Sequence, residues 1–328
     1  MDPKKLRIVF MGTPDFAVAC LRALVENGYS VVAVVTVPDK PAGRGQQITY
    51  SAVKQYAMQE GLAVLQPEKL KDESFLSELS LLKPDLNIVV AFRMLPEVVW
   101  NMPRLGTFNL HASLLPRYRG AAPINWALIN GDTESGVTTF KIEHQIDTGN
   151  IIFQEKVEIA PTDNAEVLHD KLMKIGAPLV MKTVDALALG NIEMISQEAL
   201  ISKGIMPTPA PKIFKDDCQI NWNESPDRIK NLIRGLSPYP AAWTNWANAA
   251  TGQSLSLKIF NVEAEFIDHD LKLGSIKSDG KTFLKIACKN GFINVLELQL
   301  AGKKRMPIGD FLRGFSALGD YRCVSPCE

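Results

Sequence analysis

Residues 6–37 read LRIVFMGTPDFAVACLRALVENGYSVVAVVTV, and this stretch decides the fold. It opens with a short apolar run, Leu6 to Met11, that ends at a Gly-Thr-Pro turn. Phe16 to Asn27 then carries apolar residues at helical spacing, and a second apolar run follows at Val31 to Val37. The stretch therefore predicts a strand, a helix and a second strand.

The same alternation continues toward the middle of the chain. The next expected elements are a helix near Ser51 to Glu60, a strand at Ala63 to Leu65, a helix at Asp72 to Leu82 and a strand at Leu86 to Ala91. Strands that alternate with helices form parallel sheets with right-handed crossovers. We therefore expect an α/β fold with a doubly wound, mostly parallel, Rossmann-like sheet, in which ligands bind beyond the carboxyl ends of the strands.

One strand end carries residues suited to chemistry. Residues 108–120 read FNLHASLLPRYRG, so an apolar strand runs directly into a loop that contains Pro and ends at Gly. Side chains alternate faces along a strand, which places Asn109 and His111 on the same face. An isolated Asn-x-His pair is also found as a purely structural polar pair, so strand geometry alone leaves both roles open.

The composition changes after residue 190. Before it, Val137 to Glu143 and Ile151 to Ile159 predict strands, and Asn164 to Leu189 predicts a helix. Three prolines within residues 207–211 then exclude a continuing helix. We expect a catalytic domain at 1–190, a linker at 191–206 and a C-terminal domain at 207–328.

The C-terminal domain is predicted to be a small, OB-like antiparallel β-barrel. A helix at Pro226 to Leu236 precedes short alternating stretches at Leu255 to Val262, Gly274 to Ile276, Phe283 to Ala287 and Phe292 to Leu300. Trp222, Trp243 and Trp246 are expected in its core, because the basic residues that accompany a base-stacking platform are sparse here. From residue 210 onward, 16 Lys and Arg residues face 13 Asp and Glu residues, so the domain is mildly basic.

Charge and cysteine content exclude several classes of protein. Lys plus Arg and Asp plus Glu each number 36, so no global positive field points to nucleic acid. The five cysteines are scattered and form no Cys-x-x-Cys pair, which indicates reduced thiols and neither disulfides nor a metal site. With no signal peptide and no apolar run of bilayer length, we expect a cytoplasmic protein with no membrane role. His144, His169 and His269 are expected to face solvent.

Six motifs follow one another along the chain. They are GTPDF at 12–16, PDKPAGRG at 38–45, NLH at 109–111, SLLPRYRGAAP at 113–123, IDTG at 146–149 and AGKK at 301–304. In order and spacing these motifs resemble the methionyl-tRNA formyltransferase family over nearly the whole chain. The resemblance implies transfer of a formyl group from 10-formyltetrahydrofolate to the methionine of initiator methionyl-tRNA, leaving tetrahydrofolate, at the start of translation.

The resemblance also implies a catalytic trio. Attack of an amine on a formamide-like carbon develops an oxyanion, which the carboxamide of Asn109 is suited to stabilise. His111 is expected to hold the proton that leaves the attacking nitrogen and reaches the departing one. Asp147 is expected to orient the imidazole and to stabilise its charged form. Nothing in this chemistry requires a metal.

Binding residues are implied in the same way. Ser113, Leu114, Leu115 and Pro116 are expected to line the folate pocket. Arg44, between two glycines, is expected to reach the end of the tRNA acceptor stem. Lys303 and Lys304 are expected to contact phosphates of the tRNA backbone, and the protein is expected to act as a monomer.

Other functions were weighed against this one. A formyltransferase acting on a nucleotide-linked amino sugar would keep the same trio, but the Arg44 loop and the tract from Gly120 to Pro123 favour tRNA. The intact trio argues against a non-catalytic tRNA-binding module, and the missing Gly-x-Gly-x-x-Gly fingerprint argues against a nicotinamide oxidoreductase. Residues 91–96, AFRMLP, depart from the family's usual Ala-Tyr-Gly-x-Ile-Leu-Pro loop by one residue fewer and by arginine in place of glycine.

Overall fold

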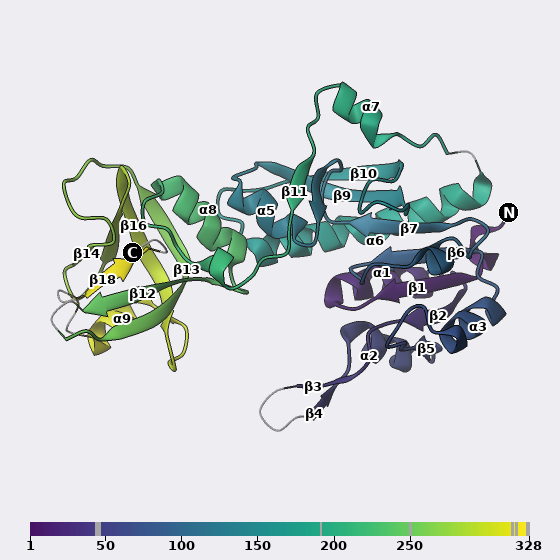
Figure 1. Cartoon of the computed structure of the whole chain (residues 1–328), viewed down its shortest axis with the longest axis horizontal. Coiled ribbons are helices and arrows are strands. Elements are labelled where there is room, and N and C mark those ends of the chain that lie inside the picture. Colours follow the sequence, from purple (N-terminus) through teal and green to yellow (C-terminus); the bar gives the residue numbers. More distant parts are fainter. Residues whose placement is uncertain (43–46, 191, 249–250, 316–317, 319–320, 326–328) are drawn as a thin grey trace. The chain divides into compact units, whose positions relative to one another are not determined.

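A computed structural model of the chain describes residues 1–42, 47–190, 192–248, 251–315, 318 and 321–325 (Figure 1). The chain divides into two compact units. The first comprises Met1–Gly120, Glu134–Val157 and His169–Ala210, and the second comprises Ala121–Thr133, Glu158–Leu168 and Pro211–Glu328. The domain limits expected at 1–190, 191–206 and 207–328 stay predictions.

Within the described residues, the first unit is built on a seven-stranded sheet in the order β10-β9-β7-β6-β1-β2-β5. In that order the strands are Ile151–Glu158, Glu134–Lys141, Thr107–His111, Leu86–Val90, Ile8–Gly12, Val31–Val35 and Val64–Leu65. The strands from β7 to β5 run parallel, and β9 is antiparallel to β7. The predicted doubly wound, mostly parallel sheet is therefore confirmed.

Helices cover both faces of this sheet. On one face α3 (Glu73–Leu81) packs Phe75 and Leu79 into a cluster with Val9 and Met11. On the other, α6 (Ala165–Leu189) lies so close to β7 that a Cβ on Gly176 would be 2.8 Å from the side chain of Leu110. The remaining elements of this unit are α1 (Asp15–Glu26), β3 (Lys40–Ala42), β4 (Gln47–Thr49), α2 (Ala52–Gln59), α4 (Glu97–Trp100), β8 (Arg117–Gly120), α7 (Gln197–Ser202) and β11 (Thr208–Ala210).

Three strand ends meet at one edge of the sheet. β1 lies between β2 and β6, so the crossovers that follow β1 and β5 lead to opposite sides of it. The register pairs Gly12 of β1 with Val90 of β6, and Val90 with Leu110 of β7. The loops after β1, β6 and β7 therefore leave the same edge, at the switch point where open α/β sheets bind ligands.

The second unit contains an antiparallel sheet in the order β14-β15-β16-β13-β12-β18. Its strands are β12 (Ala242–Asn248), β13 (Ser254–Glu265), β14 (Ile276–Ser278), β15 (Leu284–Cys288), β16 (Gly291–Leu300), β17 (Met306–Pro307) and β18 (Tyr321–Val324), and its helices include α5 (Pro123–Ile129), α8 (Pro226–Leu236) and α9 (Ile308–Gly314). A bridge between Ser275 and Arg322 joins the two edges, which nearly closes the sheet into the predicted barrel.

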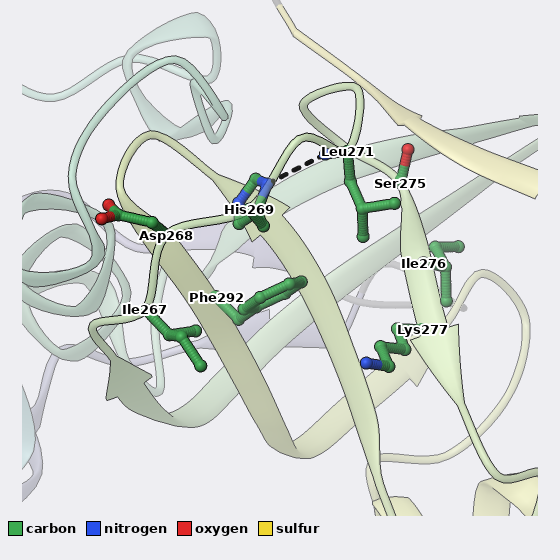
Figure 2. A pocket seen from close by; sticks show the side chains of 8 residues that line it. All are labelled: Ile267, Asp268, His269, Leu271, Ser275, Ile276, Lys277 and Phe292. Atoms are coloured by element: carbon green, nitrogen blue, oxygen red, sulfur yellow. Dashed lines mark hydrogen bonds between the residues drawn. The ribbon is translucent and has the colours of Figure 1, made fainter.

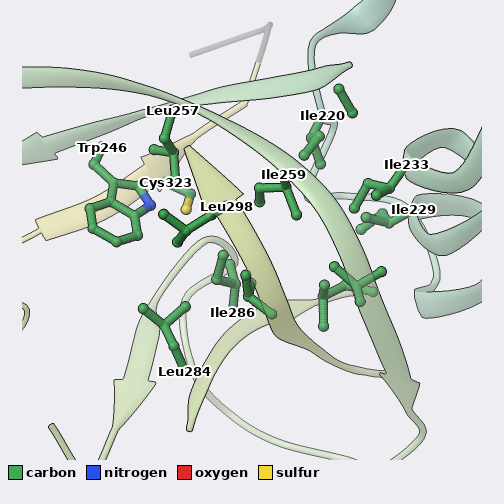
Figure 3. Packing of buried hydrophobic residues seen from close by; sticks show 14 of the residues in the cluster. Ile220, Ile229, Ile233, Trp246, Leu257, Ile259, Leu284, Ile286, Leu298 and Cys323 are labelled. Atoms are coloured by element: carbon green, nitrogen blue, oxygen red, sulfur yellow. The ribbon is translucent and has the colours of Figure 1, made fainter. Parts of the chain in front are cut away.

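The barrel core gathers large apolar side chains from almost every strand (Figure 3). Ile229 and Ile233 of α8 enter it from one side, Leu298 lies near its middle, and Trp246 lies at the opposite end (Figure 3). Trp222 and Trp246 are fully buried, and Trp243 packs against the cluster while partly buried. The expectation that these tryptophans belong to the core is confirmed.

Candidate active site

The carboxyl end of β7 presents Asn109 and His111 on one face of the sheet. Asn109 pairs in register with Val89 on one side and Phe140 on the other, so both neighbours fix its backbone. Its carboxamide is only half-buried and has no hydrogen-bond partner among the described residues. An oriented amide without a protein partner is free to donate to a ligand.

The imidazole of His111 is buried, with a hydrogen-bond partner at Nε2 and a carboxylate near Nδ1. Nε2 lies 2.8 Å from the carbonyl oxygen of Tyr118, and Nδ1 lies 3.8 Å from Oδ2 of Asp147. The ring of Phe140 packs edge-on against it, with centroids 6.4 Å apart. Both nitrogens therefore face oxygen atoms that can accept hydrogen bonds.

Asp147 reaches this position from a tight turn between β9 and β10. Its backbone has φ of 54°, a left-handed conformation that Asp adopts more readily than most residues. Oδ2 accepts a hydrogen bond of 2.9 Å from the backbone N–H of Gly120, and the side chain is 14% exposed. The structure thus brings an imidazole, a carboxylate and an unpaired carboxamide to the end of one strand.

The loop from Ala112 to Pro116 is fastened by two polar side chains of β9 and β10. Thr138 donates its hydroxyl to the carbonyl of Ser113 and accepts from the N–H of Leu115, while Gln154 donates to the carbonyl of Leu115. Sequence reasoning missed both residues, although a Thr and a Gln within apolar strands are a signal of such internal bonds.

The four side chains expected to line the folate pocket differ in how deeply they are buried. Ser113 is fully buried and donates to the carbonyl of Arg117, and Leu115 packs against Phe140 and Ile151. Pro116 is also buried, after a cis peptide bond. Leu114 is half-buried, so of the four it offers the most surface to a ligand.

Arg93, in the shortened loop after β6, donates hydrogen bonds to the backbone of another segment. Nη1 donates to the carbonyl of Glu68 over 2.7 Å, and Nη2 donates to the carbonyl of Pro67. Desolvation lowers the pKa of this guanidinium. Arg93 therefore links the loop after β6 to the loop that contains Pro67 and Glu68.

The expected tRNA contacts fall in two places. Arg44 lies outside the described residues; it stands between β3 and β4, which pair as a hairpin. Lys303 and Lys304 are exposed in the turn between β16 and β17, where the N–H of Lys303 bonds to the carbonyl of Leu300.

A hollow of about 480 Å³ lies in the second unit, lined by Ile267, Asp268, His269, Leu271, Ser275, Ile276, Lys277 and Phe292 (Figure 2). Nε2 of His269 lies within hydrogen-bond distance of the carbonyls of Cys288 and Gly291, and Nδ1 accepts from the N–H of Leu271. The expectation that His269 faces solvent is wrong, because these bonds and the ring of Phe292 hold it in place. The hollow contains none of the residues predicted to act in catalysis or binding.

The described residues contain no group of three or more His, Cys, Asp or Glu side chains that could hold a metal ion. Of the helices that the structure describes, none has both the length and the hydropathy to span a membrane.

Comparison with known proteins agrees with this fold. Residues 6–184 match the family described as formyl transferase, and residues 212–316 match the formyl transferase C-terminal domain. Solved structures with the same fold include WlaRD, a sugar 3N-formyl transferase (TM-score 0.63, 20% identity, 91% of this chain and 99% of that one), and HypX from Aquifex aeolicus in complex with tetrahydrofolic acid (TM-score 0.60, 15% identity, 94% and 48%). The chain is a member of the formyl transferase class.

Curated relatives define the branch. The methionyl-tRNA formyltransferase of Bacteroides thetaiotaomicron is 58% identical over 322 residues, 98% of this chain and 99% of the relative. That of Parabacteroides distasonis is 60% identical over the same shares of both chains, and that of Phocaeicola vulgatus is 61% identical over 96% and 97%. The chain belongs to the methionyl-tRNA formyltransferase family.

Proposed function

We propose that this protein transfers the formyl group of 10-formyltetrahydrofolate to the α-amino group of methionine on initiator methionyl-tRNA. The observation that carries the proposal is the His111 and Asp147 pair beside the unpaired carboxamide of Asn109, in a chain about 60% identical to methionyl-tRNA formyltransferases over nearly full length. Formylation of this amine yields N-formylmethionyl-tRNA for translation initiation.

Asn109 and His111 share the work of the reaction. The amine lone pair attacks the formyl carbon, and the carbonyl electrons move onto oxygen, where the Asn109 carboxamide donates a hydrogen bond to the oxyanion. The new C–N bond leaves a proton in excess on the attacking nitrogen. When the oxyanion collapses, the bond from the formyl carbon to the folate nitrogen breaks, and that nitrogen gains a proton.

His111 is suited to hold this proton between the two nitrogens. The carboxylate of Asp147 lies 3.8 Å from Nδ1, and the carbonyl of Tyr118 fixes the ring through Nε2. The folate would lie against Leu114 and the backbone of the loop that Thr138 and Gln154 hold. These contacts require no movement of the buried side chains of Ser113 and Leu115.

Recognition of the tRNA is assigned to two basic groups. Lys303 and Lys304 are exposed and form no ion pair within the part of the chain that the structure describes, so their ammonium groups are available for phosphates. Arg44 is proposed to contact the acceptor stem. We also propose that the enzyme works in the cytoplasm as a monomer, since one chain carries both the catalytic trio and the basic groups.

The decisive experiment offers the protein two acceptors with 10-formyltetrahydrofolate. Methionyl initiator tRNA should yield N-formylmethionine after deacylation, whereas a nucleotide-linked amino sugar should remain unformylated. Turnover of the amino sugar with no product on the tRNA would replace the proposal by the sugar-modifying alternative. Sedimentation of the protein at micromolar concentration tests whether it is a monomer.

A further inference from the structure

Gln197 is the first residue of α7 and lies in the stretch that the sequence predicts to be a linker. Its side chain is nonetheless fully buried and uses its whole hydrogen-bonding capacity. Nε2 donates to the carbonyls of Asp147 and Gly149, each over 2.9 Å. Oε1 accepts from Nε and Nη2 of Arg119, over 3.1 and 2.7 Å.

The two carbonyls that Gln197 binds flank Thr148, at the centre of the turn that carries Asp147. One primary amide therefore fixes the backbone on both sides of this residue. Because Asp147 is in a left-handed conformation, which is unfavourable for a residue with a Cβ, the turn needs such support. Ile195 adds to it, since its backbone exchanges two hydrogen bonds with Ile151 just after the turn.

The same arrangement ties the turn to β8 twice. Arg119 of β8 reaches the turn through Gln197, and Gly120 of β8 donates its N–H to the Asp147 carboxylate. This carboxylate is the group 3.8 Å from His111 Nδ1. The orientation of the carboxylate toward the imidazole thus depends on a frame whose central member is Gln197.

We propose that Gln197 is a positioning residue for formyl transfer, which acts by holding Asp147 in register with His111. The proposal rests on the roles given above to His111 and Asp147. Gln197 contacts neither substrate nor the reacting atoms; it sets where the carboxylate stands, and a displacement of about 1 Å at a catalytic group can cost on the order of a hundredfold in rate.

Two substitutions separate positioning from simple packing. Gln197→Leu keeps the volume and removes all four hydrogen bonds. Gln197→Glu keeps an acceptor for Arg119 but, when ionised, cannot donate to the carbonyls of Asp147 and Gly149. Glu198→Gln is the matched control, because Glu198 is exposed on the same helix, and its carboxylate accepts a hydrogen bond from Ser196 and forms none with Arg119, Asp147 or Gly149 within the described residues.

The kinetic expectation is a loss in kcat and not in KM. Both Gln197 variants should lower kcat on the order of tenfold or more, with KM for 10-formyltetrahydrofolate and for tRNA within about twofold of the parent. In an Asp147→Asn background the further loss from Gln197→Leu should shrink to about twofold, because residues that act through one another are not additive. Full activity of Gln197→Glu, or additive losses, would overturn the proposal.

A second readout does not depend on turnover. The Gly120 amide is protected by its bond to Asp147, so hydrogen exchange in peptides covering Gly120 should accelerate in both Gln197 variants and stay unchanged in Glu198→Gln. Unchanged exchange in Gln197→Leu and Gln197→Glu would refute the frame. If the parent uses an amino sugar instead of tRNA, the proposed function fails while the kinetic test proceeds with that acceptor.

Discussion

The imidazole of His111 lies between two acceptors, the carbonyl of Tyr118 and the carboxylate of Asp147. A carbonyl cannot donate, so the hydrogen bond at Nε2 places the N–H of the ring there, and Nδ1 faces the carboxylate. These contacts fix the orientation of the ring, which a group that carries a proton between two nitrogens needs.

Removal of either reacting side chain should affect chemistry and spare binding. We expect Asn109→Ala and His111→Ala each to lower the single-turnover rate on the order of a hundredfold or more, because each removes a group that acts in the transition state. Filter binding should give unchanged affinity for methionyl-tRNA. A variant that turns over normally but binds tRNA poorly would show that its role is wrongly assigned.

Gly149 is required by close approach of the chain to itself. A Cβ built there would lie 1.8 Å from the carbonyl oxygen of Lys141. Gly149→Ala should destabilise the protein by about 1–3 kcal/mol in urea unfolding, since the turn must move. Gly309→Ala in α9 is the control, because a Cβ there meets nothing within 4 Å, and it should be neutral or slightly stabilising. Equal effects of the two variants would contradict this reason.

At the scale of elements, three hydrogen-bonded side chains lie at the start of the hairpin of β3 and β4. We call this cluster of Asp39, Lys54 and Gln66 the polar clasp. Asp39 accepts hydrogen bonds from Lys54 of α2 over 2.6 Å and from Gln66 over 2.8 Å, and Gln66 also donates to the carbonyl of Val37. The clasp ties the chain after β2 to α2 and to the residue after β5. The base of the hairpin is thereby fixed to the sheet.

This clasp predicts a pH dependence of stability. The hydrogen bond from Lys54 and that from Gln66 hold the pKa of Asp39 below its ordinary value of 3.8. A lowered pKa stabilises the folded state above the unfolded value, and the contribution disappears as the pH falls through the folded value. The parent should therefore exceed Asp39→Asn in urea midpoint at pH 7, and the difference should narrow below pH 3.8. A difference that persists at lower pH would point to packing instead.

Sequence patterns predicted the elements of the sheet better than the contacts between them. The run Leu6 to Met11 predicted β1, observed at Ile8–Gly12, because a strand buried on both faces consists of consecutive apolar residues. The pairing of β8 with β11 and the bonds of Gln197 join residues about 50–90 positions apart and leave no local periodicity. His269 was misjudged for the same reason, since its partners at Cys288 and Gly291 are distant in the chain.

The candidate site was predictable only in part. Strand alternation placed Asn109 and His111 on one face, whereas Asp147 was predicted through family spacing, because an Asp-Thr-Gly turn by itself is an ordinary turn. The frame behind Asp147 could not be anticipated, since a glutamine in a polar stretch usually faces solvent.

At the scale of the whole molecule, affinity for tRNA should depend on salt. Lys303→Ala combined with Lys304→Ala should weaken binding and reduce the slope of log affinity against log salt by roughly one per lysine removed. The kcat at saturating tRNA should stay close to that of the parent. An unchanged slope would exclude phosphate contact by these lysines.

The thiols give a second test of the whole molecule. Burial raises the pKa of Cys20 and of Cys288 to about 12, and it also raises the pKa of Cys218 and Cys323. At pH 8 the native protein should therefore release at most one equivalent of chromophore from Ellman's reagent, at Cys327, which lies outside the described residues. All five should react in guanidinium. Rapid reaction of two or more native thiols would contradict the burial.

The burial of Gln197 has a consequence for anyone who recombines this protein. The residues that look like a spacer after α6 belong to the compact unit that ends at Ala210. A fusion that exchanges the C-terminal barrel at residue 190 would discard Gln197 and the strand β11, which pairs with β8. A chimera that replaces the C-terminal barrel to accept a new substrate should therefore keep the native sequence through Ala210 and join the new domain after it.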